Sequence, residues 1–165
     1  MRQSFLTMLL GITLVSACGG TSYAGGVYRD GAVHFAVEAP SGPWRSTEVE
    51  GAHDLAWTHS ESAAVIHVGG SCDPRLDLPL PALTNHLLIG FTEREVLSEE
   101  RRPFQGREAL DSHVVAKLDG VVRELRLLVL KKDDCVYDFA LVSSRSAFAD
   151  ANVTFTGVID SFEAR

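Results

Sequence analysis

The sequence predicts an α+β fold: an antiparallel β-sheet with a mid-chain helix and a C-terminal helix packed on it. Several long segments alternate apolar and polar side chains, which is typical of half-buried strands. Two other segments space their apolar residues three and four positions apart, which is typical of amphipathic helices. The dipeptide Asp119-Gly120 lies between two extended segments and favours a tight hairpin, because a type I′ turn needs positive φ at both central residues.

The first twenty residues are typical of a bacterial lipoprotein export signal. Arg2 supplies a positive charge, and the run from Phe5 to Ala17 is apolar apart from two threonines and a serine. This length fits the apolar core of a signal peptide and falls short of the roughly 20 residues that span a bilayer. The run ends in Val15-Ser16-Ala17-Cys18, which resembles a lipobox. We therefore expect a signal peptide over residues 1–17 and acylation of the Cys18 thiol.

Ordinary secretion stays open as an alternative to lipidation, and the destination of the lipidated protein is a separate question. Ordinary secretion, with cleavage at a site such as Ser22-Tyr23-Ala24, would leave the protein without a lipid. With lipidation, Gly19 in place of an aspartate favours sorting to the outer membrane, facing the periplasm. Two or three acyl chains would make that anchoring stable, since each buried CH2 adds ~0.8 kcal/mol.

The remaining chain is long enough for one domain. Residues 18–26 are rich in Gly and Ser and are expected to form a flexible tether, with a single domain over residues 27–165. The formal net charge of the whole chain is −7, and loss of Arg2 with the signal peptide makes the mature chain more acidic. This charge argues against nucleic acid as a partner and against a polybasic grip on lipid. Contact with the membrane is therefore expected only through the N-terminal lipid.

Short strands followed by a helix are expected in the first half of the domain. The expected strands are residues 32–38, a short strand that opens at Trp44, residues 55–59 and residues 63–68. Gly69-Gly70-Ser71 is expected to end the last of them. The helix should cover Leu80 to Phe91, with Pro81 tolerated in its first turn.

Long strands and a closing helix are expected in the second half. The strands should cover roughly residues 95–103, 108–118, 121–131 and 136–143. Leu125 to Leu130 is apolar on both faces apart from Arg126, which is typical of a strand covered on both sides. The apolar stripe of the closing helix consists of Phe148, Ala151, Phe155, Ile159 and Phe162. Ser146 is the expected N-cap of this helix.

Cys72 and Cys135 remain once Cys18 is assigned to the lipid. An even pair in an oxidising envelope compartment predicts a disulfide. Two isolated cysteines do not make a metal site, and the pair lacks the Cys-x-x-Cys spacing of a redox centre.

Four short motifs together resemble the PsbP-like superfamily, which includes DcrB-like bacterial envelope lipoproteins. The motifs are Phe35–Pro40 followed by Trp44, Gly106-Arg107-Glu108-Ala109, Tyr137-Asp138-Phe139, and Ile159–Phe162. The resemblance covers residues 27 to 163 and implies a non-catalytic scaffold, which different members use as an assembly factor, a binding module or a secretion chaperone. It offers no catalytic residues and no cofactor.

The sequence therefore leads to a non-enzymatic, lipid-anchored envelope protein that binds an envelope protein or a small ligand. A chaperone-like module that shelters apolar segments of a client protein is one alternative, and a periplasmic metal-binding protein is another. Neutral imidazole is a common metal ligand, and four histidines occur close together in sequence: His34, His53, His59 and His67. None of them has the spacing of a zinc helix, and the strand pattern places His34 and His67 on a solvent face, so no metal site is expected.

Catalysis is not expected from the remaining polar residues. The chain has no Gly-x-Ser-x-Gly elbow, and its acidic residues are numerous and scattered, as on a solvated face. Two features could serve binding. One is the mixed-charge stripe from Glu93 to Arg102, and the other is a groove between the sheet and the helix from Leu80 to Phe91.

Overall fold

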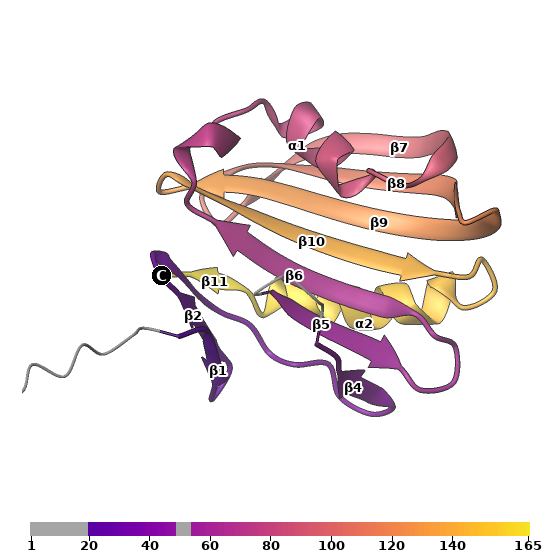
Figure 1. The fold of residues 1–165 in the computed structure, drawn as a ribbon, viewed down its shortest axis with the longest axis horizontal. Helices are drawn as coiled ribbons and strands as arrows, with labels where there is room; N and C mark the ends of the chain where they lie inside the picture. The colour runs from indigo at the N-terminus through magenta and orange to yellow at the C-terminus, as the bar shows by residue number, and fades with distance from the viewer. Residues whose placement is uncertain (1–19, 49–53) are drawn as a thin grey trace, which may run out of the picture.

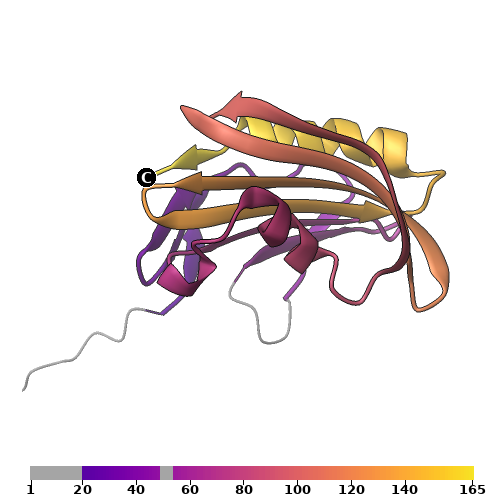
Figure 2. The same ribbon diagram turned by 90° about the horizontal axis from the view of Figure 1, so that it is seen from above.

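A computed structural model describes residues 20–48 and 54–165 (Figure 1). The predicted signal peptide, the lipidation site Cys18 and His53 lie outside the described residues. The described chain forms a seven-stranded antiparallel sheet with strand order β4-β5-β6-β10-β9-β8-β7 and a four-stranded sheet with order β1-β2-β3-β11. Helix α1 lies on one face of the large sheet and α2 on the other (Figure 2). The predicted α+β class is confirmed.

The strands of the large sheet are β4 (Trp44–Ser46), β5 (Leu55–His59), β6 (Val65–Ser71), β7 (Thr92–Phe104), β8 (Arg107–Leu118), β9 (Val121–Lys132) and β10 (Cys135–Ser143). The turn between β8 and β9 is the predicted hairpin, since Asp119 and Gly120 have φ values of 51° and 78°. Strand β9 is buried on both faces, as its composition predicts, and Arg126 is the half-buried exception within its apolar run.

The small sheet corrects the predicted tether. Its strands are β1 (Ser22–Ala24), β2 (Val27–Asp30), β3 (Val33–Ala36) and β11 (Glu163–Ala164). Strand β1 pairs with β2 across Gly25-Gly26, whose positive φ values suit a tight turn. The hydroxyl of Tyr23 donates to the carbonyl of Val37 at 2.9 Å. The folded domain therefore begins by Ser22. The predicted boundary between a flexible tether over residues 18–26 and the domain is placed too late in the sequence.

Strand β6 continues through the two glycines that the sequence predicts as its end. A Cβ at Gly69 would lie 2.9 Å from atoms of both Asp54 and His67, and a Cβ at Gly70 would lie 2.8 Å from Val33. Both distances are shorter than real Cβ contacts. The glycines are therefore packing positions within the strand, where other chain segments approach closely.

The main core lies between the large sheet, α2 (Phe148–Asp160) and the small sheet. Phe155 and Ile159 of α2 are buried there, together with Phe162 just beyond the helix. Phe35 of β3 and Phe139 of β10 contribute fully buried rings. The predicted N-cap Ser146 is wrong: the N-cap is Ala147, and the Ser146 hydroxyl lies 3.1 Å from that of Ser144.

The second layer contains a short 3-10 helix, η1 (Pro74–Leu76), and α1 (Leu80–Leu87). Helix α1 ends before the predicted Phe91, because the chain turns at Gly90, which has a φ of 90°. Within residues 20–48 and 54–165, we find no helix with the length and apolar character needed to cross a membrane.

Candidate functional site

Helix α1, beside which the sequence predicts a groove, is packed directly on the sheet. Leu80 and Leu83 are buried against Val129, and Leu88, just after the helix, is buried against Leu125. The space under α1 is filled by these side chains. Leu87 is different, because it is only half-buried and lies at the rim of this contact.

The predicted charged stripe is the exposed edge strand β7. Glu93 forms an ion pair with Lys117 at 2.7 Å, and Arg101 pairs with Glu108. The guanidinium of Arg94 donates to the carbonyl of Phe91 at 2.9 Å. These contacts link β7 to β8 and to the chain that follows α1, so the stripe has structural partners.

Arg126 is the centre of an ion network on the α2 side. Its guanidinium donates to Asp111 at 3.0 and 2.8 Å, and to Asn152 and Thr156 of α2 at 3.1 and 2.9 Å. Arg102 donates to Asp111 from β7 at 3.0 Å. Burial would raise the pKa of Asp111, but the bonds to Arg126 and Arg102 outweigh it and hold that pKa below its usual range. The network joins three strands to α2.

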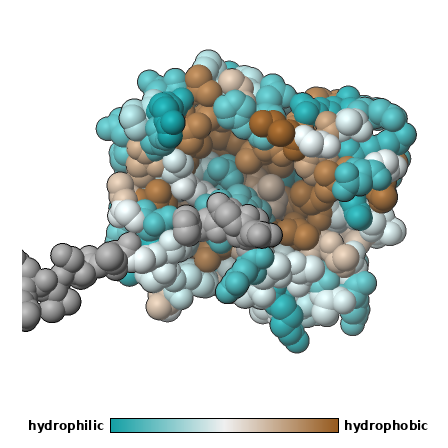
Figure 3. Space-filling model, viewed as in Figure 1, coloured by the Kyte–Doolittle hydropathy of each residue, from teal (hydrophilic) through white to brown (hydrophobic). Residues whose placement is uncertain are grey.

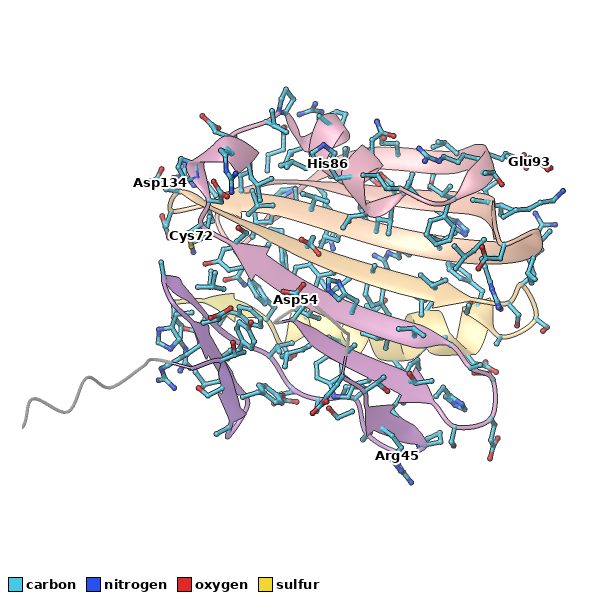
Figure 4. The ribbon with its side chains drawn as sticks, in the orientation of Figure 1. Arg45, Asp54, Cys72, His86, Glu93 and Asp134 are labelled. Atoms are coloured by element: carbon cyan, nitrogen blue, oxygen red, sulfur yellow. A yellow bond between two sulfur atoms is a disulfide. The ribbon has the colours of Figure 1, made fainter. Side chains whose placement is uncertain are left out.

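A disulfide holds one end of the large sheet. Cys72 and Cys135 are bonded, with their Cα atoms 4.0 Å apart. Lys131 adds a second link nearby, because its Nζ donates to the Asp77 carboxylate. An open cleft of about 690 Å³ lies beside both links, at the end where Figure 4 shows Cys72 and Asp134. Its charged lining carries both signs, so it favours neither a cation nor an anion: Asp73, Asp77, Arg107, Glu108, Lys131, Lys132, Asp133 and Asp134.

Among the residues that the structure describes, α1 and its flanking segments cover only part of their face of the sheet. Figure 3 shows this face hollowed near its centre, with hydrophobic atoms gathered beside the hollow. The half-buried apolar side chains packed against the core next to α1 are Leu87, Phe91, Ala140 and Val142. A ligand seated on this face would therefore meet apolar surface.

A polar cluster of Asp54, His67 and Asp138 lies on the same face. Strand register places His67 of β6 opposite Ala140, and Asp138 of β10 opposite Gly69, so their side chains share a side of the sheet. The Nε2 of His67 lies 3.1 Å from Oδ2 of Asp54, and its Nδ1 lies 3.4 Å from Oδ1 of Asp138. Figure 4 shows Asp54 near the middle of this face. The three side chains are each about one quarter exposed, at 23–26%.

Electrostatics favour a charged imidazole in this cluster. Burial alone would lower the pKa of His67, but the hydrogen bond to Asp54 and the charges of Asp138 and Asp54 outweigh burial and raise that pKa above 6.5. Burial also raises the pKa of Asp138, and the nearby Asp54 charge adds to this, while His67 opposes it. Oδ1 of Asp138 is buried and makes no hydrogen bond within the described chain.

The sequence predicts correctly that the His67 side chain points away from the main core, but it does not reveal which residues His67 contacts. The strand pattern correctly places His67 opposite to Ile66, which is fully buried. The same pattern predicts solvent on that outward side, whereas Asp54, the residue just before β5, contacts the His67 ring there. Gly69 could have indicated this contact, because a glycine inside a strand often marks a place where another chain segment approaches the backbone closely. His34, also expected on a solvent face, has a buried Nε2.

A second cavity adjoins the cluster through Asp54. Its volume is about 330 Å³, and it lies between the β1–β2 hairpin and the edge of β4 and β5. Its lining includes Tyr23, Tyr28, Thr47 and Asp54. Burial, with the charges of Asp30 and Asp54, raises the pKa of Tyr28 to about 12.

The described histidines do not converge on one point. Both nitrogens of His67 face different carboxylates, and Nδ1 of His59 accepts hydrogen bonds from the backbone of Glu61 and Ser62. His113 stacks on Phe148, with ring centroids 4.6 Å apart, and Nε2 lies 2.8 Å from Glu124. Across residues 20–48 and 54–165, no three His, Cys, Asp or Glu side chains form a group suited to a metal ion.

This antiparallel sheet with a helix on each face is a PsbP-like fold, as the sequence motifs imply. The solution structure of PsbP (CyanoP) from Synechocystis is similar to this chain with a TM-score of 0.61 and 19% identity, over 92% of this chain and 99% of that one. LpqN, involved in cell envelope biogenesis of Mycobacterium tuberculosis, has a TM-score of 0.58 and 9% identity, over 79% of this chain and 84% of its own. The sequence matches no known family profile and no curated protein.

A third similar structure is a protein of Pseudomonas aeruginosa described as a putative regulator. Its TM-score is 0.52 and its identity is 13%, over 88% of this chain and 96% of that one. At these identities the similarity concerns the fold.

Proposed function

We propose that this protein is a lipid-anchored, non-enzymatic module of the bacterial cell envelope that binds a partner protein or small ligand through the hollowed face beside α1. The observation that carries the proposal is the hollowed face of the sheet, where half-buried apolar side chains and a polar cluster occur together (Figure 3). Binding sites commonly combine apolar walls with a few converging polar groups. Both nitrogens of His67 are engaged by carboxylates, which suits a binding surface better than proton transfer to a substrate.

The export signal and the fold neighbours support the envelope part of the proposal. The sequence Val15-Ser16-Ala17-Cys18 is a candidate lipobox, and Gly19 favours outer-membrane sorting. One of the similar structures, LpqN, is described as involved in cell envelope biogenesis. A domain held by an N-terminal lipid would meet partners close to the membrane surface.

Site-specific photo-cross-linking in intact cells tests the binding face. The photoreactive residue replaces Leu87 or Val142 on the hollowed face, and Val153 on α2 serves as the control. Val153 is 75% exposed and lies on the opposite side of the large sheet, so a cross-link from this position would report non-specific contacts. We expect one defined product from Leu87 and Val142, and no such product from Val153.

Equal cross-linking from Val153 would contradict the proposed face. Products that contain many different apolar client segments would instead support the chaperone-like alternative. If the occupant is a small molecule, native mass spectrometry of the purified protein should show added mass that Leu87→Asp removes.

A further inference from the structure

We propose that Asp54, His67 and Asp138 form a proton-controlled clasp, which sets the position of Asp54 and thereby the charge of the cavity between the β1–β2 hairpin and β5. The clasp uses the polar cluster of the binding face proposed above, but it concerns the chain's own response to pH and its test needs no bound partner. Its starting point is the arrangement of one imidazole between two carboxylates, at 3.1 and 3.4 Å.

Only the protonated form of His67 can serve both carboxylates. Imidazolium carries an N–H on each ring nitrogen, whereas the neutral ring has one N–H and one lone pair. A carboxylate that faces a lone pair is repelled, and a buried one also has no compensating water. Loss of the proton from His67 must therefore break one of the two contacts.

The contact to Asp54 is the one that breaks. Oδ1 of Asp138 is buried and has no hydrogen-bond partner, so His67 is the donor available to it within the described chain. Asp54 precedes the first residue of β5 and already lines a cavity. Because Asp54 lines a cavity whereas Oδ1 of Asp138 is buried, the single remaining proton belongs on Nδ1, facing Oδ1 of Asp138.

The cross-strand partners of His67 within the described residues are Ala56 and Ala140, which carry no charge. On β2, Tyr28 interacts electrostatically with both Asp30 and Asp54, whose negative charges contribute to the raised pKa of its hydroxyl. The close contact of Gly69 with Asp54 and His67 keeps the two side chains in register while the clasp is closed.

Release of Asp54 changes the cavity of about 330 Å³ that this residue lines. While the clasp is closed, the Asp54 carboxylate is balanced by the imidazolium. After release, the same carboxylate is unpaired at the cavity wall, so the cavity becomes more anionic as His67 loses its proton. The raised pKa of His67 places this change on the alkaline side of 6.5.

Nitrogen-15 NMR of the full mature chain in detergent micelles tests the clasp directly. Long-range proton–nitrogen spectra of labelled histidine distinguish the two neutral tautomers. Above the titration of His67 we expect the Nδ1–H tautomer in the wild type and in Asp54→Asn. In Asp138→Asn we expect the Nε2–H tautomer, because Asp54 is then the remaining carboxylate. An Nε2–H tautomer in the wild type would overturn the proposal.

The movement of Asp54 has its own measurement. Backbone amide signals of Leu55 and Thr47, beside the cavity, should shift with the same midpoint as His67, and the shift should vanish in His67→Gln. His113→Gln is the matched control, since His113 also faces a carboxylate, Glu124, at 2.8 Å, and should leave the titration unchanged. Amide shifts that persist in His67→Gln, or that are lost in His113→Gln, would refute the link between the clasp and the cavity.

Discussion

Gly69 and Asp54 are in such close contact that a Cβ at position 69 would lie 2.9 Å from the Asp54 carboxylate. The contact joins the middle of β6 to the residue that precedes β5. It also explains why a glycine occurs inside a strand, where it normally weakens the ladder. The space it leaves is occupied by the carboxylate and by the imidazole of His67.

Gly69→Ala should therefore destabilise the protein by about 1–3 kcal/mol, as inserted methyl groups do in packed sites. The added Cβ would displace Asp54 from His67. Urea unfolding followed by circular dichroism measures the change. Gly157→Ala is the control, because a Cβ on Gly157 of α2 would meet no neighbouring atom within 4 Å, so alanine there should stabilise the helix by up to about 1 kcal/mol. An unchanged stability of Gly69→Ala would contradict the close contact.

The stability contributed by His67 should depend on pH with a defined sign. Its pKa is raised in the folded protein above the unfolded value of 6.5. The contribution is therefore fully present below pH 6.5 and is lost as pH rises through the folded pKa. We expect the free energy of unfolding to fall over this interval in the wild type and to change less in His67→Gln. Equal pH profiles of the two proteins would contradict this linkage.

The ion network on the α2 side should be sensitive to loss of one partner. Arg126→Leu leaves the Asp111 carboxylate, only 14% exposed, with Arg102 alone and removes the bonds to α2. We expect a loss of about 2–3 kcal/mol, typical of a partly buried charge that loses its partner. Chemical denaturation measures it, and the double variant Asp111→Leu/Arg126→Leu should lose less than the two single changes combined. Strict additivity would show that the two residues do not act together.

The long strands, the two helices and one hairpin follow from local sequence. Alternation and helical spacing depend on neighbouring residues, and Asp119-Gly120 determines its turn through backbone geometry alone. The small sheet does not follow, because β3 pairs with β11, at the far end of the chain. Once that pairing exists, β1 and β2 have a sheet to extend, and a segment rich in glycine and serine becomes ordered.

The cluster of Asp54, His67 and Asp138 could not be predicted from local sequence either, because long-range strand pairing brings its members together. Asp54 and His67 are 13 positions apart, and Asp138 belongs to a strand that joins β6 only through the sheet. Alternation gives the side on which His67 lies, but it cannot show that α1 covers only part of this face among the described residues. The proposed binding face depends on that incomplete coverage.

Two adjacent leucines distinguish core packing from the proposed binding face. Leu88 is 4% exposed, so Leu88→Asp should bury an unpaired charge and unfold the protein. Leu87 lies half-buried at the rim, so Leu87→Asp should keep the circular dichroism spectrum and abolish the cross-link formed from Val142. A folded Leu87→Asp protein that still cross-links from Val142 would move the binding face away from α1.

The early start of the folded domain brings it close to its expected anchor. Strand β1 begins at Ser22, so only residues 19–21 separate Cys18 from the sheet, four residue steps in all. An extended chain spans at most ~3.3–3.6 Å per residue, which limits this spacer to about 14 Å. The β1–β2 hairpin and the cavity beside it should therefore lie next to the membrane surface.

Cys18→Ser tests the anchor on which this placement depends. A serine hydroxyl cannot accept the diacylglyceryl group as a thioether, so the variant should not be labelled by palmitate in growing cells, whereas the wild type should. Because each buried CH2 contributes ~0.8 kcal/mol to membrane affinity, loss of the acyl chains should also move the protein from the membrane fraction to the soluble fraction. Cys72→Ser together with Cys135→Ser is the matched control, since these thiols form the disulfide and should not affect labelling. An unlabelled wild type would favour an ordinary secretion signal, and a labelled Cys18→Ser protein would show that acylation does not depend on Cys18.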